Sequence, residues 1–130
     1  MKKYDFVIYF RNHSYKNKKY FEEIIKRLNN KNYKFAIIGD KLRIKGNKNF
    51  GYISRKKAQS IISISRFAIA NPENLYSYFV QDCLSVNLIV FYNIDLKKYI
   101  TFGKKNLVSI KFKSGISDYK TVYNFVKILK

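Results

Sequence analysis

Tyr4-Asp5-Phe6-Val7-Ile8-Tyr9-Phe10 is a nearly continuous run of apolar and aromatic residues, interrupted by one early acid. Such a run is typical of a β-strand that is covered on both faces, because a half-exposed strand alternates apolar and polar residues. Strands covered on both faces belong mainly to parallel sheets that carry helices on either side. The stretch therefore predicts a buried first strand in an α/β fold.

Strand-like runs and segments of helical periodicity alternate along the rest of the chain. Further strands are expected at Phe35–Ile38, Asn47–Ile53, Phe67–Ala70, Leu88–Tyr92 and Leu107–Phe112. The expected inner faces of the helices are Tyr20, Phe21, Ile24, Ile25 and Leu28; Ala58, Ile61 and Ile62; Tyr76, Phe79, Val80, Cys83 and Leu84; and Tyr119, Val122, Tyr123, Val126 and Leu129. Their expected starts are Asn17, Ser54, Asn71-Pro72 and Ser117. This alternation predicts a Rossmann-like three-layer α/β sandwich, with a mostly parallel sheet of about five or six strands. We expect it to form one domain over residues 1–130.

The composition indicates a folded, strongly basic chain. Of 130 residues, 47% are apolar and 18% are aromatic, which is enough for a core. Lys and Arg number 27 against 8 acids, and the resulting net charge of +19 attracts phosphates and anionic lipids. However, 22 of these are lysines, and Lys, Ile, Asn and Tyr together make up 64 residues, as an AT-rich coding sequence produces. The charge alone therefore does not indicate nucleic acid.

Several site classes are excluded by the rarer residues. Cys83 is the single cysteine, which excludes an intramolecular disulfide, and with one histidine it falls short of the usual zinc ligand sets. We interpret Cys83 as a core thiol. The longest uncharged stretch, Cys83–Ile94, is shorter than the roughly 20 apolar residues of a membrane-spanning helix. The single cysteine and the absence of a signal-peptide pattern before Tyr4 lead us to expect a cytoplasmic protein. We also expect no metal and no cofactor.

The polar loop after the first strand carries two cations, Arg11 and Lys16. Ligands of open α/β sheets bind beyond the carboxyl ends of the strands, where this loop is expected. The two cations and the following helix start can hold a diphosphate, but an ordinary solvated loop also accounts for them. His13, in the same loop, can titrate near neutrality or be a bystander. Other residues expected at this edge are Gly39, Asp40 and Asn93.

Glu73 has two interpretations, one structural and one functional. It follows Asn71-Pro72 at an expected helix start, where an acid offsets the positive end of the helix dipole. Alternatively, its carboxylate binds ribose hydroxyls while the backbone amides of Asn74, Leu75 and Tyr76 face a diphosphate. The residues alone leave both interpretations open.

Asp82 lies nine residues after Glu73, half a turn away from it if both are helical. The two acids can reach one ligand only if the helix begins after Glu73. The sequence contains no P-loop, no Gly-x-Gly-x-x-Gly motif and no Ser/His/Asp arrangement. No catalytic residue is therefore assigned.

Taken in chain order, these segments resemble the C-terminal, donor-binding half of GT-B glycosyltransferases over about residues 4–93. The matching segments are Arg11 and Lys16 for its R-x4-K; Ile37-Ile38-Gly39-Asp40 for its second-strand ending; Asn49-Phe50-Gly51-Tyr52-Ile53-Ser54 for its "flGyvs" segment; Phe67-Ala68-Ile69-Ala70 with Pro72-Glu73 for the strand and first acid of E-x7-E; and Asp82 for the second acid. The chain departs from the family where the acids lie one residue further apart, Asp replaces Glu, and the glycines after the first acid are absent.

The resemblance implies a domain that binds a nucleotide-sugar donor for glycosyl transfer in polysaccharide biosynthesis. In this family, cations at the positions of Arg11 and Lys16 bind the diphosphate, and an acid at the position of Glu73 contacts the donor. The resemblance also implies a second, acceptor-binding domain or subunit, without which the chain turns over slowly or not at all. A peripheral contact with the anionic inner face of the membrane is compatible with this assignment.

Two alternatives stay open at the level of sequence. Tyr4-Asp5, Gly46 and the stretch from Ser65 to Cys83 are similar to TIR domains, another parallel α/β fold with signalling or NADase activity. A basic module that binds nucleic acid or an anionic surface is the non-enzymatic alternative. The compositional bias argues against nucleic acid as the partner.

Overall fold

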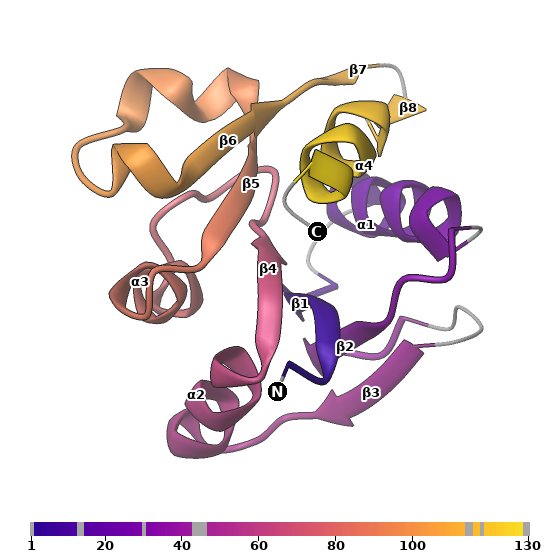
Figure 1. The fold of residues 1–130 in the computed structure, drawn as a ribbon, viewed down its shortest axis with the longest axis vertical. Helices are drawn as coiled ribbons and strands as arrows, with labels where there is room; N and C mark the ends of the chain where they lie inside the picture. Colours follow the sequence, from indigo (N-terminus) through magenta and orange to yellow (C-terminus); the bar gives the residue numbers. More distant parts are fainter. Residues whose placement is uncertain are drawn as a thin grey trace.

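A six-stranded sheet forms the centre of the computed structural model, which describes residues 2–12, 15–29, 31–42, 47–113, 116–117 and 119–128. The strand order is β3-β2-β1-β4-β5-β6, and each neighbouring pair is parallel (Figure 1). The strands are β1 (Tyr4–Phe10), β2 (Phe35–Gly39), β3 (Asn47–Gly51), β4 (Ser65–Ile69), β5 (Ile89–Asn93) and β6 (Leu107–Ile110). The predicted parallel sheet of five or six strands is confirmed.

The apolar run that opens the chain lies in the middle of this sheet. Phe6 pairs with Phe35 of β2 on one side and with Phe67 of β4 on the other. Phe6 and Ile8 pack in the core of one sheet face, while Val7 packs in the core of the other. Because both faces of β1 are covered, its residues are apolar without alternation.

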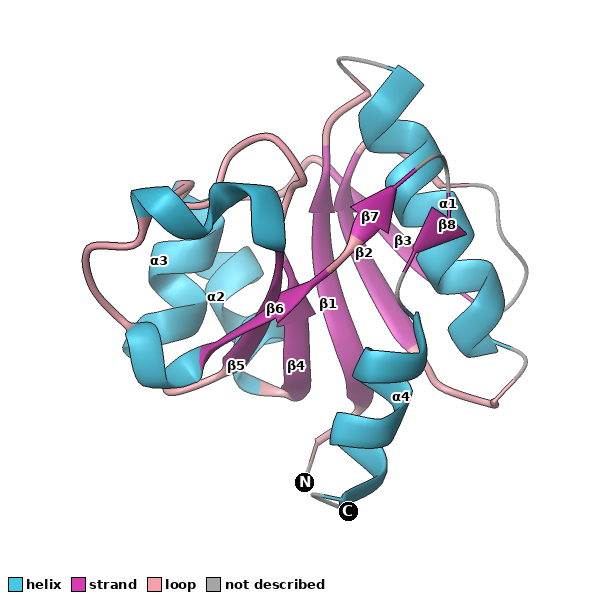
Figure 2. Cartoon of the chain, turned by 90° about the horizontal axis from the view of Figure 1, so that it is seen from above, coloured by secondary structure: helices cyan, strands magenta, loops and turns pink. Residues whose placement is uncertain are grey.

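Helices cover both faces of the sheet, which completes the predicted three-layer sandwich. The helices α1 (Tyr15–Asn29) and α4 (Tyr119–Ile128) lie together on one face, and α2 (Arg55–Ser63) and α3 (Tyr78–Ser85) on the other (Figures 1 and 2). The buried apolar side chains of α1 are those predicted from periodicity: Tyr20, Phe21, Ile24, Ile25 and Leu28. The predicted buried residues Val122 and Val126 of α4 are likewise confirmed.

One predicted helix start is confirmed and another is wrong. The side chain of Ser54 accepts a hydrogen bond from the Lys57 amide at 3.2 Å and caps α2. In contrast, Asn17 lies inside α1, which begins two residues earlier. Asn17 is 3% exposed and lines a cavity at the end of the sheet, so its polar side chain is placed by tertiary structure and not by a cap.

The prediction that Asn71-Pro72 opens a helix is also wrong. The Asn71 side chain accepts the amide hydrogen of Glu73 at 2.7 Å, which closes a local turn. The helix α3 begins only at Tyr78, and Ser77 caps it by accepting from the Val80 amide at 3.2 Å. Residues 70–77 therefore form a loop across the carboxyl end of β4.

Differences from the prediction concentrate in the last third of the chain. The segment after β5 forms two 3-10 helices, η1 (Ile94–Tyr99) and η2 (Lys104–Asn106), which were not predicted. The predicted sixth strand ends at Ile110, and Ser117, expected to open the last helix, lies in a hairpin of β7 (Phe112–Lys113) and β8 (Ile116–Ser117). Leu129 lies outside the described residues. Along the described chain, every helix is too short or too polar to cross a bilayer.

Candidate ligand-binding site

The candidate site lies where the strand order reverses. From β1 the chain moves to β2 and β3 on one side, then returns to β4 on the other side of β1. The loops after β1 and β4 therefore diverge and leave a crevice, the usual ligand position in open α/β sheets. A cavity of about 260 Å³ occupies this position. Its lining residues are Tyr9, Arg11, Asn17, Asn71, Glu73, Asn74, Ser77 and Phe79.

The β1 side of the cavity is cationic. Arg11 is exposed and its guanidinium lies 5.6 Å from the centre of the Tyr52 ring. Hydrogen bonding to Tyr9, and then the charge interaction with Tyr52, raise the pKa of Arg11, so the side chain is a permanent cation. A fixed cation at a cavity mouth is suited to binding phosphate.

Asp40 braces the Arg11 loop from the end of β2. One carboxylate oxygen accepts the Asn12 amide hydrogen at 2.7 Å, and the other accepts the Tyr52 hydroxyl hydrogen at 2.5 Å. This second bond raises the pKa of Tyr52. Asp40 therefore links the loops after β1, β2 and β3, and supports Arg11 without lining the cavity itself.

Gly39 allows this close approach. Its φ is +98°, and a Cβ added there would lie 2.3 Å from the Phe10 carbonyl oxygen. The amide of the next residue, Asp40, donates to that same oxygen at 2.8 Å. Only glycine combines this backbone conformation with this spacing.

The β4 side of the cavity is formed by the loop that carries Glu73. Asn93, at the end of β5, is buried and donates from its side-chain amide to the Pro72 carbonyl at 3.1 Å. Together with the turn closed by Asn71, this bond holds the loop over the sheet end. Glu73 is exposed and lies five residues before α3 begins, so it does not serve as the first-turn acid of that helix.

Leu75 and Tyr76 anchor the same loop with their side chains. Leu75 is buried in the core between the sheet and α3. The Tyr76 hydroxyl accepts amide hydrogens from Thr101 and Phe102 at 3.0 Å each and donates to the Phe102 carbonyl at 2.6 Å. Both side chains thus contact the rest of the domain. Any contact that Leu75 or Tyr76 makes with a ligand would come from its backbone.

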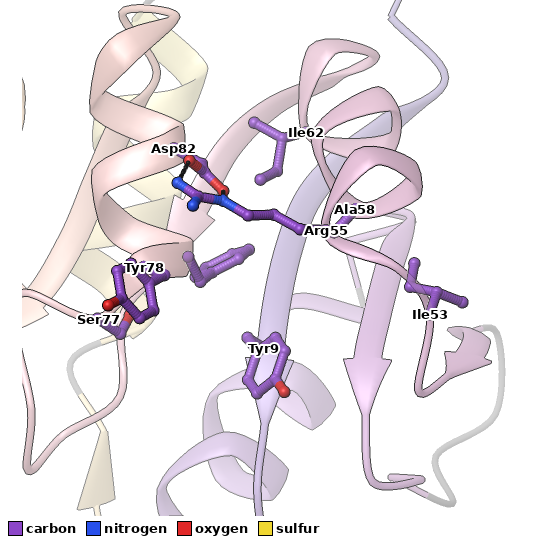
Figure 3. A pocket seen from close by; sticks show the side chains of 9 residues that line it. Tyr9, Ile53, Arg55, Ala58, Ile62, Ser77, Tyr78 and Asp82 are labelled. Carbon is purple, nitrogen blue, oxygen red and sulfur yellow. Dashed lines mark hydrogen bonds and ion pairs between the residues drawn. The ribbon is translucent and has the colours of Figure 1, made fainter.

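Asp82 faces a second cavity, on the α2 and α3 side of the sheet (Figure 3). Arg55 donates to both of its carboxylate oxygens, at 2.7 and 3.1 Å, and so joins the two helices. This ion pair lowers the pKa of Asp82, so the acid is charged near neutrality. The cavity measures about 320 Å³ and is mostly apolar.

The two cavities are neighbours that share one wall. Tyr9, Ser77 and Phe79 line both, and the rings of Tyr9 and Phe79 lie 6.0 Å apart. The two cavities therefore lie side by side, with Tyr9, Ser77 and Phe79 between them.

Three predicted site residues thus line one cavity: Arg11, Glu73 and Asn74. The structure places Asp82 in the neighbouring cavity and Asp40 behind the Arg11 loop. Lys16 belongs to α1, but its side chain lies outside the described residues, as does all of His13.

Sequence reasoning missed several lining residues: Tyr9, Asn17, Arg55, Ser77 and Phe79. Ser77 carried a usable signal, because a serine just before an apolar helix stripe is an N-cap pattern like that of Ser54. The other four had none, because each is brought to its cavity by contacts with distant parts of the chain, as Arg55 is by its bond to Asp82.

Within the described residues, no group of three His, Cys, Asp or Glu side chains is placed to hold a metal ion. Cys83 is buried, and this burial raises the pKa of its thiol far above neutrality. The predicted role of Cys83 as a core thiol is therefore supported, and the chemistry of the cavity belongs to its cations, acids and amides.

Comparison with solved structures finds this fold in a glycosyltransferase. The chain matches "E. coli heptosyltransferase WaaC with ADP" with a TM-score of 0.61 and 9% sequence identity. The match covers 97% of this chain and 44% of that chain, so this chain spans less than half of that enzyme's length. It is consistent with half of a GT-B fold. No protein-family model and no curated protein matches the sequence.

Proposed function

We propose that residues 1–130 form a nucleotide-sugar donor-binding domain of a glycosyltransferase. One observation carries the proposal: the cavity at the reversal of strand order is lined by a permanent cation on one side and by a carboxylate and an amide on the other. A nucleoside diphosphate presents the complementary groups, because its phosphates are anionic and its ribose hydroxyls donate hydrogen bonds. The fold shared with a glycosyltransferase supports the same assignment.

The proposed roles follow the position of each residue. Arg11, with Lys16, binds the diphosphate, and Glu73 accepts hydrogen bonds from the ribose. The amides of Asn74, Leu75 and Tyr76 lie on the loop nearest to these groups. Gly39 and Asp40 support the Arg11 loop, and Asp82 acts from the neighbouring cavity by holding Arg55 in place.

The chemistry proposed is displacement of the nucleoside diphosphate from the sugar. The bond between the anomeric carbon and the phosphate oxygen breaks, and the oxygen leaves with the electron pair. Arg11 stabilises the negative charge that develops there. A bond forms between the anomeric carbon and an acceptor oxygen, whose proton passes to a base in a second, acceptor-binding domain or subunit. The proposal includes a peripheral position at the cytoplasmic face of an anionic membrane, to which the net charge of +19 is attracted.

The assignment is tested by calorimetric titration with UDP, GDP, CDP and ADP and their sugars. Glu73→Gln removes a charged hydrogen bond worth roughly 1.5–3 kcal/mol, so affinity falls about ten- to a hundredfold. Its melting temperature stays close to that of the parent, because Glu73 caps no helix. Glu22→Gln on α1 is the matched control and leaves binding unchanged.

Arg11→Ala tests binding of the diphosphate separately from binding of the ribose. It weakens nucleoside diphosphates more than nucleosides, because the partner proposed for Arg11 is phosphate. Lys26→Ala, which removes an exposed cation from α1, is its control. If no nucleotide binds the parent at millimolar concentration, or both site variants bind like the parent, the proposed function is wrong.

A further inference from the structure

The connection between β5 and β6 presents aromatic rings to solvent among lysines. Tyr99 and Phe102 are 58% and 50% exposed. Four exposed lysines flank them: Lys97, Lys98, Lys104 and Lys105. Residues 94–106 contain one acid, Asp95, so the segment carries a net charge of +3. In Figure 1 it forms the orange coils beside β6, at the sheet edge opposite β3.

The exposed ring of Phe102 is held in place. The Tyr76 ring stacks on it with centroids 4.3 Å apart and planes inclined by 19°. The Tyr76 hydroxyl, as described above, binds the backbone on both sides of the turn. Because the ring is already held in one orientation, little side-chain entropy is lost when a partner buries it.

The segment is also attached to the body of the domain. Leu96 and Ile100 pack against the core on the α3 side, and the Asn106 side-chain amide donates to the Leu88 carbonyl at 3.1 Å. Gly103 approaches so closely that an added Cβ would lie 2.8 Å from the Leu84 side chain. This brings the turn after α3, with Val86 48% exposed, beside η2.

We propose that this lysine-aromatic surface, defined by Val86, Tyr99, Phe102 and the four lysines, docks the domain on an anionic phospholipid bilayer. Aromatic rings with polar neighbours favour the headgroup level of a bilayer, and each nearby lysine adds electrostatic attraction. The inference deepens the proposed function, since it assigns the membrane contact to a place on the molecule. Single-stranded nucleic acid also binds lysines and stacks on aromatic rings, and it is the competing outcome.

The lysines and the exposed aromatic rings can be replaced separately, and the effect of each is measured by co-sedimentation with vesicles. Parent protein is mixed with phosphatidylcholine vesicles that contain or lack about a third phosphatidylglycerol. Changing Lys97, Lys98, Lys104 and Lys105 to Gln lowers partitioning to the anionic vesicles by about thirtyfold or more. Changing Lys18, Lys19, Lys26 and Lys31 to Gln removes the same charge from α1 and its following turn, and is expected to lower it less than threefold.

The aromatic anchors have their own controls. Phe102→Ser lowers partitioning about tenfold, and Tyr99→Ser does so without disturbing the stack on Tyr76. Tyr15→Ser removes a ring that is 76% exposed on α1 and leaves partitioning unchanged. Circular dichroism spectra confirm that each variant is folded.

Three results would overturn this inference. The parent does not bind anionic vesicles, the α1 lysine control loses as much binding as the surface variant, or the surface variants lose binding to a short oligonucleotide while vesicle binding stays. Nucleotide titration of the fourfold lysine variant and of Tyr99→Ser is expected to match the parent. Phe102→Ser is left out of this comparison, because Phe102 stacks on Tyr76, which anchors the loop that carries Glu73. If the parent binds vesicles through this surface but binds no nucleotide, the proposed function fails and the docking surface stands.

Discussion

Asp40 connects three loops through one carboxylate. Although it does not line the cavity, we expect its replacement to weaken nucleotide binding. Asp40→Asn keeps one carbonyl oxygen, so it cannot accept from both Asn12 and Tyr52. We expect nucleoside diphosphate affinity to fall roughly five- to tenfold, since Arg11 loses its support. Tyr52→Phe removes only one of the two bonds and should have the smaller effect. Calorimetric titration of both variants measures the difference, and the reverse order would contradict the bracing role.

Gly39 and Gly51 form a matched pair for testing the packing beneath the site. Both have positive φ, +98° and +74°, but only Gly39 lies against the backbone, 2.3 Å from the Phe10 oxygen to an added Cβ. Gly51→Ala carries the conformational penalty alone, about 1 kcal/mol in the free energy of unfolding. Gly39→Ala adds a backbone collision and should cost about 2–4 kcal/mol. Urea unfolding of the two variants decides this, and equal losses would refute the close approach.

At the scale of single residues, the exposed lining residues Arg11 and Glu73 could be predicted from the sequence, whereas Asn17 and Arg55 could not. Arg11 and Glu73 follow strands that are evident from apolar runs, so their position at the sheet edge could be predicted. Asn17 was misassigned because a buried asparagine near a helix start has the same local pattern as an N-cap. Arg55 has no local signal, because its partner Asp82 lies 27 residues away.

The helices α2 and α3 are joined by the ion pair of Arg55 and Asp82, which makes their contact sensitive to acid. The pair lowers the pKa of Asp82 in the folded chain below its ordinary value of 3.8. The folded chain therefore takes up this proton less readily than the unfolded chain does, and acid favours unfolding. The stabilisation is complete above about pH 5 and is lost as the pH falls below 3.8 and through the lowered pKa.

This predicts how Asp82→Asn differs from the parent. At pH 6 the variant should lose about 1 kcal/mol of unfolding free energy, a small value because Arg55 is mostly exposed. Below about pH 3 the difference should shrink toward zero. Thermal unfolding from pH 7 to pH 2.5 measures it. Glu23→Gln, which breaks the exposed pair with Arg27 on α1, should cost less than about 0.5 kcal/mol at pH 6. A difference for Asp82→Asn that persists unchanged in acid would refute the assignment.

At the scale of elements, the start of α3 shows why boundaries were harder to predict than strands. Asn71-Pro72 and Ser77 are both plausible helix starts by local pattern. The choice depends on Asn93, which binds the Pro72 carbonyl, and on Leu75, which is buried against the core. These contacts come from other parts of the sheet, so the local sequence could not decide between the two starts.

For the whole molecule, the proposed function predicts binding without turnover. The purified chain should bind its nucleotide-sugar donor and transfer sugar slowly or not at all, because a GT-B enzyme closes two Rossmann-like halves over its substrates. A transfer assay with donor and a mixed acceptor extract, run beside the titration, measures both properties in one preparation. Rapid transfer by the purified chain would contradict the need for a second domain or subunit.

The architecture as a whole could be predicted because its strongest signals are repeated. Five strands and their intervening helices each carry a periodic or continuous apolar pattern, and alternation then requires parallel pairing. The hairpin of β7 and β8 and the helices η1 and η2 are too short to carry a period. The turn between η1 and η2 depends on the contact of Tyr76 with Phe102, which joins parts of the chain 26 residues apart.

The central place of β1 has a consequence for synthesis on the ribosome. Asp5 and Arg66, which pair across β1 and β4, are 61 residues apart in the chain. While the nascent chain is being extended, β1 can pair with β2 but must wait for β4 to emerge. During that time an apolar strand edge stays open, and long-range parallel pairing closes it slowly. The residues that make β1 the middle of the finished sheet thus leave the growing chain with an unpaired apolar strand edge, which other chains can pair with until β4 emerges.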